Sequence, residues 1–166
     1  DVNLDSVVPA VMDGVFYNAG QSCCAVERIY VYQSLFFDFV EKAVQCMNKL
    51  KIGDPMLDST DLGPLAQKSG MIIVANQLKD ALDKGAKITF HSGPFREGEK
   101  YLLPAILTDV NHSMDIMTKE TFGPIIGIMP VESDKQAISL MNDSPYGLTA
   151  SVWTNDRKKA LNIGNQ

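Results

Sequence analysis

The sequence is poor in cysteine and histidine, the residues that most often build disulfides and transition-metal sites. Its three cysteines are Cys23, Cys24 and Cys46, and an odd number with two adjacent members makes a poor disulfide framework. Free thiols fit a reducing compartment, so we expect the protein in the cytoplasm. The two histidines, His91 and His112, lie far apart and lack a partner at metal-ligand spacing. We therefore predict no metal site and expect both histidines to be surface or loop residues.

Further absences narrow the class of protein. There is no excess of positive charge, because the net charge is -5, and this argues against a nucleic acid as partner. No window holds the roughly 18 apolar residues that a membrane span needs. The sequence contains no glycine-rich dinucleotide motif, no phosphate-binding loop and no basic-then-apolar leader. Since it begins at Asp1 and stops at Gln166 within a helical pattern, we expect the chain to be part of a longer protein.

Hydrophobic periodicity predicts helices that alternate with strands. Apolar residues recur every three or four positions over residues 5–18, 35–50 and 69–84. Asp5 or Ser6 could cap the first of these helices, and the second has the apolar face Phe37, Val40, Val44 and Met47, with Cys46 in a packing position. Ser133 and Gln136 form a capping box for a helix to about residue 141, and Asn155 or Asp156 caps a last helix. Strands are expected at 28–32, 87–91, 102–107, 124–131 and 149–154, with a turn at 91–100 and Trp153 in the core. The pattern predicts one α/β domain, a three-layer αβα sandwich with a largely parallel sheet.

The most informative segment is residues 16–25, where Cys23 lies among small residues between the first helix and the first strand. Gly20 permits a sharp turn or the close approach of a ligand. A free thiol with a pKa of about 8.5 is only about 3% ionised at pH 7, so a catalytic thiol needs activation by dipoles or a base. Backbone N–H groups of such a loop could supply that field and hold an oxyanion. Chemistry alone leaves the role of Cys23 open, because most free cysteines are buried and inert.

Two motifs resemble those of a known family. Residues 18–23 (Asn-Ala-Gly-Gln-Ser-Cys) resemble the cysteine signature of the aldehyde dehydrogenase superfamily, whose nucleophile stands two residues after the glutamine. Residues 119–124 (Lys-Glu-Thr-Phe-Gly-Pro) resemble the glutamate-x-phenylalanine-glycine-proline motif of that family. Agreement in the same order continues through three further segments, 52–64, 101–107 and 142–150. The resemblance extends over essentially the whole chain.

The resemblance implies a role for three residues. Cys23 would be the catalytic nucleophile, Glu120 would hold the hydroxyls of the nicotinamide ribose, and Phe122 would pack beside that ribose. A carboxylate can accept two ribose O–H bonds, so the role of Glu120 is chemically sound. Without the flanking motif, Glu120 would be interpreted as a solvated surface acid and Phe122 as a core aromatic.

The resemblance also implies an activity. It is the oxidation of a small-molecule aldehyde with NAD or NADP, through a thiohemiacetal and a thioester on Cys23, by a protein that assembles as a homo-oligomer. The family's general base, its oxyanion-binding asparagine and most of its dinucleotide-binding domain lie upstream of the nucleophile, where this chain has only 22 residues. We therefore expect a fragment of the catalytic domain, with the dinucleotide-binding domain absent from the chain and little or no turnover by the chain alone.

Two alternatives remain open from the sequence. A non-catalytic α/β domain for scaffolding or association would explain why no general base is found. A cysteine-dependent hydrolase or acyltransferase would pair its thiol with a histidine, but neither His91 nor His112 stands in a supporting motif.

Overall fold

The computed structural model of the chain describes residues 1–93 and 101–166. The α-helices are α1 (Leu4–Phe16), α2 (Phe36–Met47), α3 (Lys68–Asp83), α4 (Asp134–Asn142) and α5 (Arg157–Gly164). The strands are β1 (Arg28–Tyr32), β2 (Lys87–His91), β3 (Ala105–Thr108) and β4 (Ile125–Val131). Most of the turn expected at 91–100 lies outside the described residues. No helix of the described part is long and apolar enough to cross a membrane.

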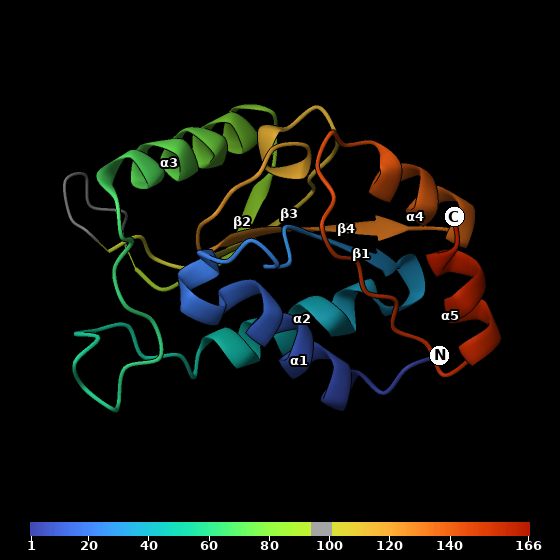
Figure 1. The fold of residues 1–166 in the computed structure, drawn as a ribbon, viewed down its shortest axis with the longest axis horizontal. Helices are drawn as coiled ribbons and strands as arrows, with labels where there is room; N and C mark the ends of the chain where they lie inside the picture. Colours follow the sequence, from blue (N-terminus) through green and yellow to red (C-terminus); the bar gives the residue numbers. More distant parts are fainter. Residues whose placement is uncertain (94–100) are drawn as a thin grey trace.

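The strands form one sheet in the order β1-β4-β3-β2. β4 pairs in parallel with both β1 and β3, whereas the edge strand β2 runs antiparallel to β3. Helices α1 and α2 lie on one face of this sheet, and α3 and α4 lie on the other (Figure 1). The predicted three-layer α/β fold with a largely parallel sheet is therefore confirmed.

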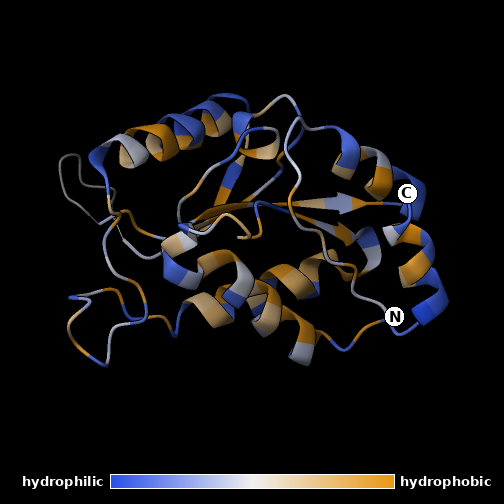
Figure 2. Ribbon diagram, in the orientation of Figure 1, coloured by the Kyte–Doolittle hydropathy of each residue, from blue (hydrophilic) through white to orange (hydrophobic). Residues whose placement is uncertain are grey.

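The hydrophobic core lies on both faces of the central strand β4. Ile125, Ile126 and Ile128 are buried, as expected for a strand between two helical layers. Hydrophobic residues concentrate in the strands and in α1 and α2, while α3 and α5 alternate between hydrophobic and hydrophilic (Figure 2). In α2, Val40 and Met47 are buried as predicted, but Phe36 is buried at the start of the helix and Phe37 is 75% exposed.

Residues 149–154 do not form the predicted strand, and Trp153 is 47% exposed instead of lying in the core. A β-branched and aromatic segment becomes a strand only where a neighbour offers backbone hydrogen bonds, and no strand of the described chain pairs with this one. Its end contacts the start of the chain instead, where Thr154 Oγ1 donates to Asp1 Oδ2 at 2.9 Å. The caps were predicted more accurately at the later helices, because Asp156 caps α5 and Ser133 caps α4. At α1 the cap is Asn3, not Asp5 or Ser6.

The two sequence motifs enter adjacent parallel strands. Residues 17–27 lead into β1 and residues 118–124 lead into β4, with Arg28 opposite Gly127 in the register. Because the amino ends of parallel neighbours share one edge of a sheet, both motifs lie at that edge.

Backbone contact joins the two motifs. Gly20 has a φ of +74°, and the preceding Asn18 and Ala19 are also left-handed, with φ of 50° and 55°. A Cβ on Gly20 would overlap the carbonyl oxygen of Gly123, and a Cβ on Gly123 would overlap a methyl group of Val74 on α3. Glycine at position 20 therefore lets the two loops touch, and glycine at position 123 lets the second loop lie against α3.

Gly20→Ala tests this contact. We expect a loss of about 2–4 kcal/mol in the free energy of unfolding, because the new methyl group meets a fixed carbonyl at a left-handed φ. Urea unfolding followed by circular dichroism measures the loss. The matched control is Gly70→Ala on α3, where the Cβ meets nothing within 4 Å and helix propensity predicts a gain of up to about 1 kcal/mol. Equal stability of the two variants would contradict the assigned contact.

Candidate active site

The thiol of Cys23 lies in a tight turn at the surface. The turn is closed by the N–H of Ala25, which donates to Ser22 O at 3.0 Å, and it places Cys23 and Cys24 at the two central positions. Both residues are exposed, whereas Cys46 is half-buried and packs against the core. Within the described chain, neither the sulfur nor the backbone N–H of Cys23 makes a hydrogen bond. Both groups are therefore open to a ligand.

Two polar residues of the cysteine motif hold the turn in place. Asn18 Nδ2 donates to Gln21 O and Gln21 Nε2 donates to Asn18 O, each at 3.1 Å. The remaining oxygen of the Gln21 amide accepts the N–H of Ala66 at 2.8 Å, which ties the loop to the segment before α3. These side chains satisfy backbone groups that the left-handed bend leaves without helix or sheet partners. Asn18 and Gln21 are thus structural members of the motif.

In the second motif, outward and inward side chains alternate. Glu120 is exposed and Phe122 is 42% exposed. The interpretation of Phe122 as a core aromatic is therefore wrong. Between these two residues Thr121 is buried, and its hydroxyl donates to Gln77 Oε1 of α3 at 2.8 Å. Gln77 Nε2 in turn donates to Glu120 O at 2.9 Å. Gln77 of α3 therefore fixes the backbone of residues 120–121, while the Glu120 carboxylate and the Phe122 ring stay exposed.

Glu27 holds the same loop from the other side. Its carboxylate accepts the N–H of Thr121 at 2.8 Å and the N–H of Phe122 at 3.2 Å. Burial raises the pKa of this carboxyl above its usual value, the nearby Glu120 charge raises it further, and the two backbone N–H groups pull it down. Sequence analysis missed both Glu27 and Gln77. The available signal for Gln77 was a polar residue on the buried stripe of α3, three residues after Val74.

Glu120 and Phe122 present an exposed carboxylate and an exposed aromatic ring on the same loop. A carboxylate and an aromatic ring stand two residues apart on a backbone that Glu27 and Gln77 hold, so two acceptor oxygens lie beside an apolar surface. The positive φ of Phe122, 52°, is a conformation that a bulky residue adopts only when its surroundings impose it. The contact between Gly20 and Gly123 joins this loop to residues 17–27, the thiol loop, which carries Cys23.

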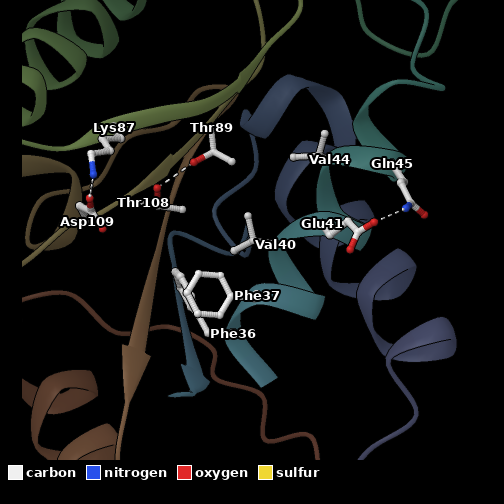
Figure 3. Close-up of a pocket in the computed structure, with 10 residues that line it drawn as sticks. All are labelled: Phe36, Phe37, Val40, Glu41, Val44, Gln45, Lys87, Thr89, Thr108 and Asp109. Atoms are coloured by element: carbon white, nitrogen blue, oxygen red, sulfur yellow. Dashed lines mark hydrogen bonds and ion pairs between the residues drawn. The ribbon is translucent and has the colours of Figure 1, made fainter. Parts of the chain in front are cut away.

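A groove elsewhere on the molecule does not contain these residues. It has a volume of about 620 Å³ and lies between α2 and the β2–β3 edge (Figure 3). Its polar walls are already paired, since Lys87 bonds to Asp109 at 2.8 Å and Thr89 bonds to Thr108 at 2.7 Å. Phe37 lies along it and contacts the ring of Phe36 edge-on. The groove accounts for the exposure of Phe37 and has no group poised for chemistry.

The histidines have structural partners. His91 Nδ1 lies 2.6 Å from Gly93 O. His112 is in a loop, as predicted, but it is half-buried: its Nε2 lies 2.8 Å from the hydroxyl of Tyr30 and its Nδ1 lies 2.9 Å from Asp143. Burial raises the pKa of Tyr30 to about 12. Neither histidine bonds to Cys23, which removes the support for a cysteine–histidine hydrolase. Residues 1–93 and 101–166 contain no group of three or more His, Cys, Asp or Glu arranged to hold a metal ion.

Comparison with known proteins agrees with this geometry. The sequence profile of the Aldehyde dehydrogenase family matches residues 1–166. The chain is 38% identical to a 4,4'-diapolycopene aldehyde oxidase of Methylomonas sp, over 100% of this chain and 30% of that protein. It is 34% identical to the D-glyceraldehyde dehydrogenase (NADP(+)) of Thermoplasma acidophilum, over 94% of this chain and 32% of that protein.

Solved structures give the same result. The crystal structure of an NADP-dependent enzyme of E. coli superposes with a TM-score of 0.94 at 32% identity, over 99% of this chain and 34% of that one. The chain thus spans about a third of the length of the relatives that it matches. With a profile match over its whole length and the two motif loops in contact, the chain belongs to the aldehyde dehydrogenase family.

Proposed function

We propose that the chain is the thiol-bearing catalytic part of an NAD(P)-dependent aldehyde dehydrogenase, with Cys23 as its nucleophile. The observation that carries this proposal is the contact between Gly20 and Gly123, because it joins the loop with the exposed thiol to the loop with the exposed carboxylate and ring. A non-catalytic scaffold domain has no need for a free thiol beside such a surface. The dinucleotide-binding domain and the general base then belong to other segments of the parent enzyme, which we expect to be a homo-oligomer.

The chemistry proposed for Cys23 is covalent. Its thiolate adds to the aldehyde carbon, a C–S bond forms, and the carbonyl π electrons move to the oxygen to give a thiohemiacetal oxyanion. The free backbone N–H of Cys23 is a donor that can stabilise this oxyanion. Bound NAD(P) supplies the hydride acceptor that converts the thiohemiacetal into a thioester. Water then cleaves the C–S bond, and the thiol of Cys23 is regenerated with release of a carboxylate.

Glu120 and Phe122 have a positioning task in this scheme. The carboxylate of Glu120 accepts hydrogen bonds from the ribose hydroxyls, and the ring of Phe122 supports the sugar from its apolar side. Both residues stand on a backbone segment that Gln77 fixes, so the ribose is held at a set place relative to the Cys23 turn. Orientation of this kind contributes to rate because the reacting centres meet without a further search.

Thiol reactivity gives a first test. Iodoacetamide is expected to alkylate Cys23 at least about tenfold faster than Cys46 in the folded chain, since Cys23 is exposed and Cys46 packs against the core. Mass spectrometry of peptides at successive times measures both rates. Because Cys24 is exposed as well, the measurement is made on Cys24→Ser, and urea serves as the control that should equalise the rates. Faster labelling of Cys46 in the native state would count against the assignment.

The isolated 166-residue chain is expected to produce little or no NADH or NADPH from a simple aldehyde. The reason is that the family's base and most of its cofactor site have no counterpart among the matching motifs of this chain. Absorbance at the nicotinamide band follows the reaction, with Cys23→Ser as the blank. Robust turnover by the isolated chain would show that activity does not depend on other segments of the parent enzyme. If Cys23→Ser abolished that turnover, the result would still support Cys23 as the nucleophile.

A chimera tests the activity itself. Residues 1–166 replace the aligned segment of the Thermoplasma acidophilum D-glyceraldehyde dehydrogenase (NADP(+)), which covers 94% of this chain. We expect oxidation of D-glyceraldehyde with NADP+, and a loss of about 10³-fold or more in Cys23→Ser, because no other group replaces the nucleophile. Cys46→Ser is the matched control and should retain the activity. A folded chimera whose turnover survives Cys23→Ser would exclude Cys23 as the nucleophile.

A further inference from the structure

We propose that Glu27 is a positioning residue, whose carboxylate sets the place of Glu120 and Phe122 by holding the backbone between them. This inference rests on the proposed function for its consequence, the binding of the nicotinamide ribose. Its structural part stands alone, because it concerns two hydrogen bonds that cross from the thiol loop to the second motif. Glu27 lies four residues after Cys23 and 93 residues before Glu120 in the chain.

The geometry is that of a bidentate clamp. One carboxylate oxygen accepts the N–H of Thr121 at 2.8 Å and the other accepts the N–H of Phe122 at 3.2 Å. Hydrogen bonds to an ionised acceptor are about twice as strong as neutral ones, and a planar carboxylate that accepts two neighbouring N–H groups also fixes their orientation. Since Phe122 is left-handed, its backbone needs such a constraint. Glu120 and Phe122 stand at the two ends of the backbone segment whose N–H groups Glu27 holds, so the position of their side chains depends on that segment.

The clamp and α3 hold different atoms of the same loop. Gln77 bonds to the carbonyl of Glu120 and to the side chain of Thr121, whereas Glu27 takes the two N–H groups. Without Glu27, these N–H groups would need another acceptor, because Gln77 bonds to the carbonyl of Glu120 and the hydroxyl of Thr121 and to neither N–H group. The thiol loop is therefore the part of the chain that completes the second motif.

The charge of Glu27 is the sensitive part of the clamp. Burial and the Glu120 charge raise the pKa of Glu27, so it loses its charge at a higher pH than an exposed glutamate does. A protonated carboxyl accepts less strongly than the ion and has a donor of its own, which weakens its bonds to the two N–H groups. As the pH falls through this range, the two hydrogen bonds are expected to weaken, because both N–H groups favour the ionised carboxylate. Besides burial, the Glu120 charge raises the pKa of Glu27, and the backbone N–H groups of Thr121 and Phe122 lower it.

Nuclear magnetic resonance of the 166-residue chain tests the clamp without a cofactor. The amide proton signals of Thr121 and Phe122 are expected to titrate together, with a midpoint above the usual value of a glutamate carboxyl. In Glu27→Gln this titration should vanish and exchange of the two amide protons should quicken about tenfold. Glu120→Gln should keep the titration and lower its midpoint. Glu132→Gln is the matched control and should change neither signal.

Each contrary result is decisive. Absence of the titration in the unaltered chain overturns the proposal even if Glu27→Gln fails to fold. A titration that persists in Glu27→Gln and disappears in Glu120→Gln assigns the effect to Glu120 and also overturns it. Glu27→Asp, one methylene shorter, should hold at most one of the two N–H groups and give an intermediate exchange rate.

The consequence for the cofactor is measured in the chimera with the Thermoplasma enzyme. Glu27→Gln is expected to raise the KM for NADP+ about tenfold and to leave kcat within about threefold, because ribose binding is shared by the ground state and the transition state. If the chimera is active and Glu27→Gln leaves its KM for NADP+ unchanged, Glu27 has no positioning role in cofactor binding, and the proposed function still stands. A folded chimera with no Cys23-dependent turnover contradicts the proposed function, and the resonance titration then decides on the clamp separately.

Discussion

The candidate site depends on the direct backbone contact between Gly20 and Gly123. Two loops that are about a hundred residues apart in sequence reach the same edge because β1 and β4 are parallel neighbours. Parallel pairing brings them only to the same edge, and side chains at the crossing would hold them apart. The absence of a Cβ on Gly20 lets the carbonyl of Gly123 lie close to it, and the absence of a Cβ on Gly123 lets that loop pack against Val74 of α3. Cys23 and Glu120 are thereby placed on two loops that cannot move independently.

The site lies at the amino ends of these strands. Open α/β sheets more often bind ligands outside the carboxyl ends, where helices begin. Here the entering loops have no helix N-terminus to supply N–H groups, so the site uses those of its own irregular backbone. The left-handed conformation of residues 18–20 and 122 costs about 1–2 kcal/mol for each non-glycine residue. Asn18, Gln21 and Glu27 offset that cost through hydrogen bonds to the same loops.

Much of the fold could be predicted because its elements carry local signals. The apolar run of β4 and the caps Ser133 and Asp156 are encoded within a few residues. The strand expected at 149–154 does not form, because strand pairing is not a local property of the sequence. Phe37 was predicted to be buried, but the neighbouring Phe36 lies on the buried face of α2. In the candidate site, the motifs singled out Cys23, Glu120 and Phe122, whose roles stay predictions. Glu27 was missed because its partners are backbone N–H groups more than 90 residues away, which no spacing in the sequence reveals.

The structure also divides the cysteine motif into two kinds of residue. Asn18, Gly20 and Gln21 are explained by the bend, since one permits a contact and two satisfy the backbone. Of residues 18–23, only Cys23 presents a reactive group with no structural partner. A match to such a motif is therefore chiefly a match to a backbone shape, and it predicts where a thiol will stand. The role proposed for the thiol depends on the second loop, because a thiol in the same bend without the Glu120 and Phe122 loop would have no candidate cofactor surface beside it. The proposed function thus rests on the contact between the loops more than on either motif alone.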